Sequence, residues 1–212
     1  MKSMFEAFQT GSGVACNWMR PVSAIICSCF VLTGGATLGD IHLEPLRQYP
    51  TGLYATGILA ADLDGDGDTD LAISNRGTDD ITIRWNNGNG FFPDRTDHPT
   101  GAGPRYVDGA DFDGDGDIDL CTPDYNNDSV TVLRNHGNAH FTIGHQFQLN
   151  KTVYLWTDDL DLDGNSDIAV LQWDGTADPP SQNPALLTPF YGSGSGNLTE
   201  GDSAYIGLQP RC

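Results

Sequence analysis

The sequence predicts an all-β fold made of β-propeller-type repeats: three four-stranded blades plus one extra outer strand, as in a partial or open propeller. Three observations lead to this prediction. A nine-residue acidic pattern starts at residues 62, 111 and 159, so it recurs after 49 and then 48 residues. Each period contains four short runs of apolar and β-branched residues separated by turn residues. No segment shows the 3.6-residue hydrophobic period of a helix.

Residues 1–36 are predicted to be a secretory signal peptide. An apolar run at 22–33 lies behind Arg20, and small residues follow, with cleavage expected near Ala36. The run is shorter than an ordinary transmembrane helix requires, so no membrane insertion is expected after cleavage. The alternatives are an over-extended gene start, an uncleaved anchor, and lipidation within residues 26–29.

The remaining sequence divides into three repeats preceded by one strand. Residues 49–52 (YPTG) align with residues 98–101 (HPTG), which indicates that the chain enters on an outer strand of a missing blade. The predicted parts are an outer strand at 37–52, repeats at 53–101, 102–149 and 150–207, and a tail at 208–212. Because a closed propeller needs about four to eight blades, we expect a fragment, an open arc, or a homo-oligomer in which two copies close a ring.

Each repeat is expected to hold four strands in the same order. The first is a small apolar run (57–61, 106–110, 153–156), and the second follows the acidic pattern (71–74, 120–122, 168–173). The third is expected at 81–85, 129–134 and 185–191, and the fourth, more polar strand at 91–98, 140–149 and 198–206. Asn- and Gly-rich turns join the third strand to the fourth, because these residues tolerate positive φ. Inner strands are expected to crowd the propeller axis.

The acidic pattern, D-x-D-x-D-G-x-x-D, is the candidate functional motif. Its carboxylates converge when the loop curls around one ion, and a glycine at position 6 allows the sharp turn. Without an ion these carboxylates would repel each other. An all-oxygen, strongly negative shell suits Ca²⁺ better than Mg²⁺, so up to three Ca²⁺ ions are expected. Positions 1, 3, 5 and 9 are expected to contribute carboxylates, and position 7 its backbone carbonyl. The predicted ligands are Asp62, Asp64, Asp66, Asp68 and Asp70; Asp111, Asp113, Asp115, Asp117 and Asp119; and Asp159, Asp161, Asp163, Asn165 and Asp167.

The loops differ from an EF-hand, which requires a glutamate at position 12 and flanking helices. Position 12 holds Ile73, Thr122 and Val170, and the residues after each loop predict strands. The third loop is the least acidic, because Asn165 replaces a carboxylate and Leu162 replaces a glycine. The third site is therefore expected to be the weakest.

The net charge of −19 comes largely from the loops, which hold 14 of the 29 acidic residues. This charge argues against nucleic acid or an anionic membrane as a partner. Of the five cysteines, only Cys121 and Cys212 lie beyond the predicted leader, which excludes a disulfide framework. Cys121 falls among strand residues and is expected to be a small buried hydrophobe.

Residues 61–71 and 110–120, with the Asn/Gly turns and phenylalanines at 86–92 and 135–141, resemble the FG-GAP/VCBS repeat family. These are the calcium-loop propeller blades of integrin α subunits and many exported bacterial proteins. The resemblance implies a β-propeller, calcium in the loops, and an extracellular binding or adhesion role without chemistry. We therefore expect a secreted or cell-surface protein, or alternatively a periplasmic one, that binds an extracellular protein or glycan.

Catalysis is not expected from the sequence. His136, His140 and His145 cluster around one predicted hairpin, but a polar outer hairpin explains them better than a transition-metal site does. The glycine tract at 192–196 lacks the lysine and following helix of a phosphate-binding loop. The alternatives to a binding protein are a propeller-based polysaccharide lyase or hydrolase, and a non-functional fragment of a larger surface protein.

Overall fold

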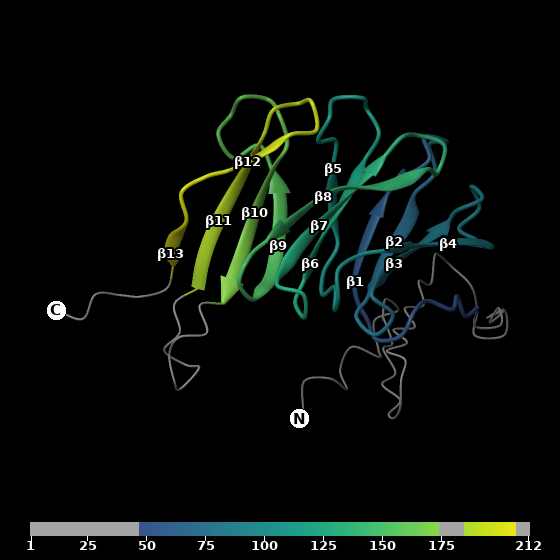
Figure 1. The fold of residues 1–212 in the computed structure, drawn as a ribbon. Helices are drawn as coiled ribbons and strands as arrows, with labels where there is room; N and C mark the ends of the chain where they lie inside the picture. The colour runs from purple at the N-terminus through teal and green to yellow at the C-terminus, as the bar shows by residue number, and fades with distance from the viewer. Residues whose placement is uncertain (1–46, 174–184, 207–212) are drawn as a thin grey trace, which may run out of the picture. The chain divides into compact units, whose positions relative to one another are not determined.

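The computed structural model describes residues 47–173 and 185–206 (Figure 1). The predicted leader, residues 37–46 of the predicted first strand, and the tail at 208–212 lie outside the described residues. The described part of the chain contains thirteen strands and no helix, so it has no helix long and apolar enough to cross a membrane. All thirteen strands belong to one compact unit, Tyr49–Cys212. The all-β prediction is confirmed.

The strands form three antiparallel sheets that follow one another in chain order. The first contains β1 (Ala55–Ala61), β2 (Asp70–Asn75), β3 (Asp80–Trp85) and β4 (Asp94–Pro99). The second contains β5 (Asp108–Ala110), β6 (Asp119–Asp124), β7 (Ser129–Asn135) and β8 (Phe141–Gln148). The third contains β9 (Thr152–Asp158), β10 (Asp167–Trp173), β11 (Ala185–Gly192), β12 (Leu198–Glu200) and β13 (Ala204–Ile206). The prediction of three four-stranded sheets plus one extra strand is confirmed.

The extra strand among the described residues lies in the third sheet. Both β12 and β13 pair with β11, so together they occupy the outer position of that sheet. The sequence predicts the extra strand at 37–52, but the described part of that range, residues 47–52, contains no strand. The shared Pro-Thr-Gly sequence marks a loop instead. A Cβ on Gly52 would collide with Asn75, and one on Gly101 would collide with Asp124, so both glycines allow the loop to approach the sheet.

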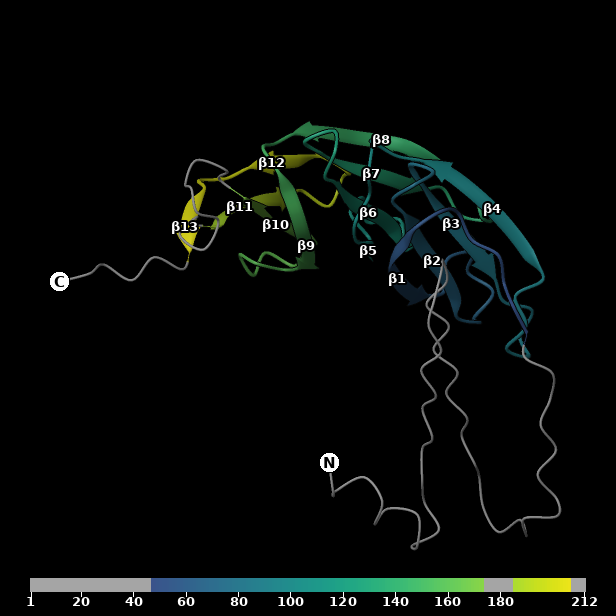
Figure 2. The same ribbon diagram turned by 90° about the horizontal axis from the view of Figure 1, so that it is seen from below.

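The apolar cores lie between neighbouring sheets, which stand side by side in Figure 2. We call the face of a sheet that packs against the next sheet its forward face, and the opposite one its rear face. The forward faces carry Leu63, Ala72, Ile81 and Ile83 in the first sheet, and Phe112, Cys121, Val130 and Val132, each 49 residues later, in the second. The rear faces carry Val107, Leu120 and Leu133 in the second sheet, and Leu155, Ile168 and Phe190 in the third. Cys121 is buried, as the sequence predicts, and its thiol is free.

Burial follows from this packing. The central strands of the first two sheets are buried along almost their whole length, whereas β4 and much of β8 face solvent, as expected for polar outer strands. β1 is mostly exposed, against the expectation of a crowded inner strand. The reason is that no sheet among the described residues packs against the rear face of the first sheet.

A buried polar cluster lies at the end of each sheet opposite the acidic loop. In the first sheet, Asn75 Nδ2 donates to Thr82 Oγ1 at 2.8 Å. At the equivalent position of the second sheet, Asp124 Oδ2 accepts hydrogen bonds from the hydroxyls of Thr131 and Ser129, at 2.5 and 3.2 Å. Burial raises the pKa of Asp124 to about 6, although these two hydrogen bonds oppose the change.

We expect Asp124→Asn to remove a pH-dependent loss of stability. The folded-state pKa of Asp124 lies above its ordinary value, so its contribution is complete below about pH 4 and is lost as the pH rises through about 6. The free energy of unfolding of the wild type, minus that of the variant, should fall by roughly 3 kcal/mol from about pH 4 to pH 7, since a pKa difference of one corresponds to about 1.4 kcal/mol. Urea denaturation at constant calcium measures this difference. A difference that does not change with pH would contradict the assignment.

Candidate metal centres

The three acidic loops occupy equivalent places in the three sheets. Each joins the first strand of its sheet to the second, at 62–69, 111–118 and 159–166 (Figure 1). The joined strands are antiparallel neighbours, so each loop reverses the chain within a few residues. Each acidic loop is thereby fixed at both ends by the ladder of its own sheet.

In each loop, three carboxylates offer oxygens that lie within 4.8 Å of one another. The three groups are Asp62, Asp64 and Asp66; Asp111, Asp113 and Asp115; and Asp159, Asp161 and Asp167. Calcium binds oxygen at about 2.3–2.6 Å, so oxygens on opposite sides of one ion lie up to about 5 Å apart. Each triad therefore has the dimensions that one calcium ion requires.

The aspartate at position 1 shapes each loop from within. Asp62 accepts the Gly65 amide through one oxygen at 2.9 Å and the Gly67 amide through the other at 3.0 Å. The corresponding bonds join Asp111 to Gly114 and Gly116, and Asp159 to Asp163 and Gly164. Backbone donors thus hold the curled form of the loop, while the other lone pairs of these oxygens remain available to a cation.

The aspartate at position 9 joins each loop to the turn between the third and fourth strands of its sheet. Asp119 Oδ2 accepts the Phe112 amide at 3.2 Å, and its Oδ1 accepts the Asn135 amide at 2.7 Å. The equivalent pairs are Asp70 with Leu63 and Asn86, and Asp167 with Leu160 and Gly192. The acidic pattern predicts only a metal-binding role for position 9, so this link to the turn is a finding of the structure. The asparagines that open two of the turns, at 86 and 135, were the available signal.

Burial raises the pKa of three carboxyls in the first two loops. Burial raises the pKa of Asp119 to about 6, its two backbone hydrogen bonds oppose the change, and the charges of Asp113 and Asp115 add to it. The pKa values of Asp70 and Asp64 are raised with the same leading cause. A bound cation favours the ionised form and acts in the opposite direction. The loops thus carry an electrostatic cost that a divalent cation would remove.

Asp113 gives the clearest indication of a cation. Its Oδ2 pairs with Arg134 Nε at 3.0 Å, but its Oδ1 is buried and has no hydrogen-bond partner. Leaving a buried acceptor unsatisfied costs about 1–3 kcal/mol, and more for a charged group. A hard divalent ion in the second triad would supply the missing partner. Together with an all-oxygen donor set, this observation shows that the residues present fit calcium.

Each of the first two loops also contacts the next sheet. Asn135 Nδ2 donates to Leu63 O at 2.9 Å, and the Gly196 amide donates to Phe112 O at 3.0 Å. Leu63 and Phe112 hold position 2 of their loops, and their side chains are buried in the cores between the sheets. The conformation of each of these two loops therefore affects how the following sheet packs against the sheet that carries the loop.

The third loop gathers a different set of carboxylates. Asn165 donates its backbone amide and its side-chain Nδ2 to the two oxygens of Asp163, each at 2.8 Å. Asp163 lies outside the triad of this loop, and Asp167 takes its place. This difference supports the expectation that the third loop is the weakest cation site.

Nine of the fifteen predicted ligand residues form the three triads. The other six are Asp68, Asp70, Asp117, Asp119, Asp163 and Asn165. Position 7 is expected to contribute its backbone carbonyl, and the side chains of Asp68 and Asp117 lie against turn glycines of their own sheets. A Cβ on Gly88 would be 2.6 Å from the Asp68 carboxylate, and one on Gly137 would be 2.8 Å from that of Asp117.

Backbone strain also distinguishes the third loop. Position 6 is glycine in all three loops, with φ of 92°, 93° and 89° at Gly67, Gly116 and Gly164. Position 4 also requires positive φ, which is met by glycine in the first two loops and by Leu162 at 65° in the third. The Leu162 side chain is 87% exposed, so it gains little packing there.

The three clustered histidines have other roles. His136 Nε2 lies 2.8 Å from the Thr142 hydroxyl, and His145 Nε2 lies 2.8 Å from Gly196 O. Within the described residues, no group of three or more metal-binding side chains includes a histidine.

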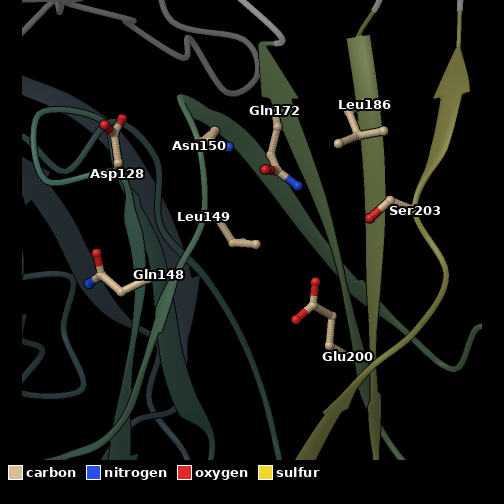
Figure 3. A pocket seen from close by; sticks show the side chains of 8 residues that line it. All are labelled: Asp128, Gln148, Leu149, Asn150, Gln172, Leu186, Glu200 and Ser203. Carbon is tan, nitrogen blue, oxygen red and sulfur yellow. The ribbon is translucent and has the colours of Figure 1, made fainter.

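A pocket of about 510 Å³ lies at the other end of the second and third sheets, away from the acidic loops (Figure 3). Asp128, Gln148, Leu149 and Asn150 line it from one side, and Gln172, Leu186, Glu200 and Ser203 from the other. The lining is mainly polar, with amides, hydroxyl and carboxylate groups around two leucines. The sequence analysis did not identify this pocket, because the residues that form it lie far apart in the chain.

Comparison with known proteins identifies the segment that carries the loops. Residues 62–122 match the model of the FG-GAP-like repeat. The match begins at the first acidic loop, contains the second loop, and ends within β6. No curated protein matches the chain significantly. The resemblance inferred from the sequence is confirmed for these 61 residues.

We expect Leu162→Gly to stabilise the protein by about 1 kcal/mol, because a non-glycine residue in the left-handed region costs roughly 1–2 kcal/mol. Urea denaturation measures the gain. The matched control is Leu53→Gly, which changes another exposed leucine but one without positive φ. The control should lose stability, since glycine adds entropy to the unfolded chain. Equal losses in the two variants would show that Leu162 is not strained.

Proposed function

We propose that this chain is an exported calcium-binding repeat protein. In this proposal, calcium in the acidic loops stabilises the sheets, and the sheets bind an extracellular protein or glycan. The observation that carries the proposal is the gathering of nine carboxylates into three equivalent loops, two of them inside the FG-GAP-like match. The metal has a structural role here, because each loop is joined to its own turn, and the first two also to the next sheet.

An extracellular location agrees with the chemistry of the loops. Their carboxylates are partly exposed, and sites of this kind need only Kd values of order 10⁻⁴–10⁻³ M where calcium is abundant. The predicted signal peptide at 1–36 supports export and lies outside the described residues. The acidity of the chain, with a net charge of −19, also disfavours nucleic acid as the ligand.

The pocket of Figure 3 supports a hydroxyl-rich ligand such as a glycan. Gln148 and Asn150 offer exposed amides that both donate and accept hydrogen bonds, whereas the Gln172 amide and the Ser203 hydroxyl are hydrogen-bonded to the Thr188 hydroxyl. A few convergent polar groups beside apolar ones are typical of small-ligand sites. Glycan-array binding in calcium, compared between the wild type and Gln148→Ala, tests whether this pocket is the binding site.

A carbohydrate-active enzyme is the second candidate, because Asp128 and Glu200 line the same pocket. Pairs of carboxylates hydrolyse glycosidic bonds. Asp128, however, accepts the Lys151 amide at 3.0 Å and pairs with Lys151 Nζ at 3.3 Å. The Asp128 carboxylate is therefore already engaged by Lys151, which disfavours it as the catalytic partner of Glu200. Cleavage of a polysaccharide that Glu200→Gln abolishes would favour the enzyme over the binding protein.

We expect the thermal melting temperature to be higher in calcium than in chelator. An ion that binds only the folded state at a hundredfold excess over Kd adds about 2.7 kcal/mol per site. Circular dichroism melts of the same sample in excess calcium and in chelator measure the effect. Identical melts would mean that the loops do not bind calcium usefully, and the proposal would fail.

We expect Asp115→Ala to lower the melting temperature in calcium more than Asp163→Ala does. Asp115 belongs to the second triad, whereas Asp163 lies outside the third and is engaged by Asn165. Asp94→Ala is the matched control, since Asp94 is exposed on β4 and belongs to none of the triads. In chelator, the calcium-dependent part of the difference should vanish. An equal effect of Asp94→Ala would show that only the loss of negative charge matters.

A further inference from the structure

The same type of interface between neighbouring sheets occurs twice within the chain, and equivalent residues form it both times. Position 2 of the loop in one sheet packs into the core that it shares with the next sheet. Four residues before its own loop, that next sheet inserts an apolar residue into the same core. The two pairs are Leu63 with Val107, and Phe112 with Leu155. All four side chains are at most 2% exposed.

The third sheet presents this forward face without a partner among the described residues. Leu160, the residue equivalent to Leu63 and Phe112, is 43% exposed. Trp156 lies on the same face, directly across from Ala169 in the ladder, and is 61% exposed. Its equivalent in the first sheet, Leu59, packs against the core that joins the first two sheets. The forward face of the third sheet therefore keeps the apolar side chains that bind a following sheet.

The first sheet presents the matching rear face. Ile58 is equivalent to Val107 and Leu155, which are 1% and 0% exposed, yet Ile58 is 59% exposed. Ala60, on the same side of β1, is exposed as well. One chain thus carries both halves of an interface that it has already formed twice within itself.

Within the part of the chain that the structure describes, the hydrogen bonds between sheets also have no equivalent at the rear face of the first sheet or at the forward face of the third sheet. Asn135 Nδ2 donates both to Ile118 O of its own sheet and to Leu63 O of the preceding loop. Asn86, its equivalent in the first sheet, makes only the first kind of bond, from Nδ2 to Thr69 O at 2.9 Å. Among the described residues, no group donates to Leu160 O, the carbonyl equivalent to Leu63 O. Asn86 and Leu160 O are thus the donor and acceptor equivalent to Asn135 and Leu63 O, while at the second interface the Gly196 amide donates to Phe112 O.

We propose that two copies of this chain associate head to tail, with the third sheet of each packed against the first sheet of the other. In that arrangement Leu160 and Trp156 of one copy cover Ile58 and Ala60 of the second copy. Two copies supply six sheets, within the range of about four to eight that closes a propeller. Each copy uses both of its open faces, so the assembly ends at a dimer. This inference goes beyond the proposed function and does not depend on which ligand is bound.

The test is the mass of the full chain in calcium, measured by light scattering after size exclusion over a dilution series. We expect the mass of two copies for the wild type, and of one copy for Leu160→Asp and for Ile58→Asp. Both side chains are exposed in the single chain, so neither variant should unfold, and melting curves check this. Ile143→Asp is the matched control, because Ile143 is 51% exposed on the outer strand β8, away from both faces, and should leave the dimer intact.

Mixing the two monomeric variants gives a second measurement. A Leu160→Asp chain keeps an intact rear face and an Ile58→Asp chain an intact forward face, so the mixture should regain a species of two copies through one intact interface. A monomeric wild type would overturn the proposal. A dimer that survives Ile58→Asp but not Leu160→Asp would also overturn it, because two forward faces would then pair with each other. Assemblies larger than two copies would overturn the closed arrangement.

Discussion

Crowding of carboxylates in short loops between neighbouring strands is the constraint on which this structure depends. Each loop must reverse the chain within a few residues while it places several negative charges close together. Backbone amides stabilise part of that charge, through Asp62 and its equivalents at position 1 and through Asp70 and its equivalents at position 9. A divalent cation would neutralise the remaining charge and would supply a partner for the buried Asp113 oxygen that has none. In the function that we propose, the loop and its ion form one structural element.

The acidic loop affects more of the structure than the connection between its two strands. Position 9 joins the loop to the turn between the third and fourth strands, and position 2 joins it to the next sheet through a carbonyl and a buried side chain. A cation that fixes the loop thus acts on both contacts at once. The pocket that we propose for recognition lies away from the loops, at the other end of the second and third sheets.

The sequence was sufficient to predict the fold class, the repeat and the place of each loop, because these depend on local patterns. The spacing of aspartates and glycines locates the loops, and the apolar runs locate the strands to within a few residues. It could not predict features that depend on tertiary contacts. The division of the outer strand into β12 and β13, the Arg134–Asp113 pair and the exposure of Ile58 all follow from what lies beside each residue in space. Nor could it predict that Asp70 and Asp119 also accept amides from the turn after the third strand, or that Asn165 donates to Asp163.

Hydrogen exchange of backbone amides, with and without calcium, tests the coupling of metal loops to sheet packing most directly. The account predicts slower exchange in calcium at the loop amides and at Asn86, Asn135 and Gly192, whose amides donate to the position-9 aspartates. It also predicts slower exchange at the Gly196 amide, which belongs to the third sheet but donates to the second loop. Protection confined to the loops would contradict the claim that calcium stabilises the contacts between sheets. No change at any of these amides would contradict the assignment of the loops as calcium sites.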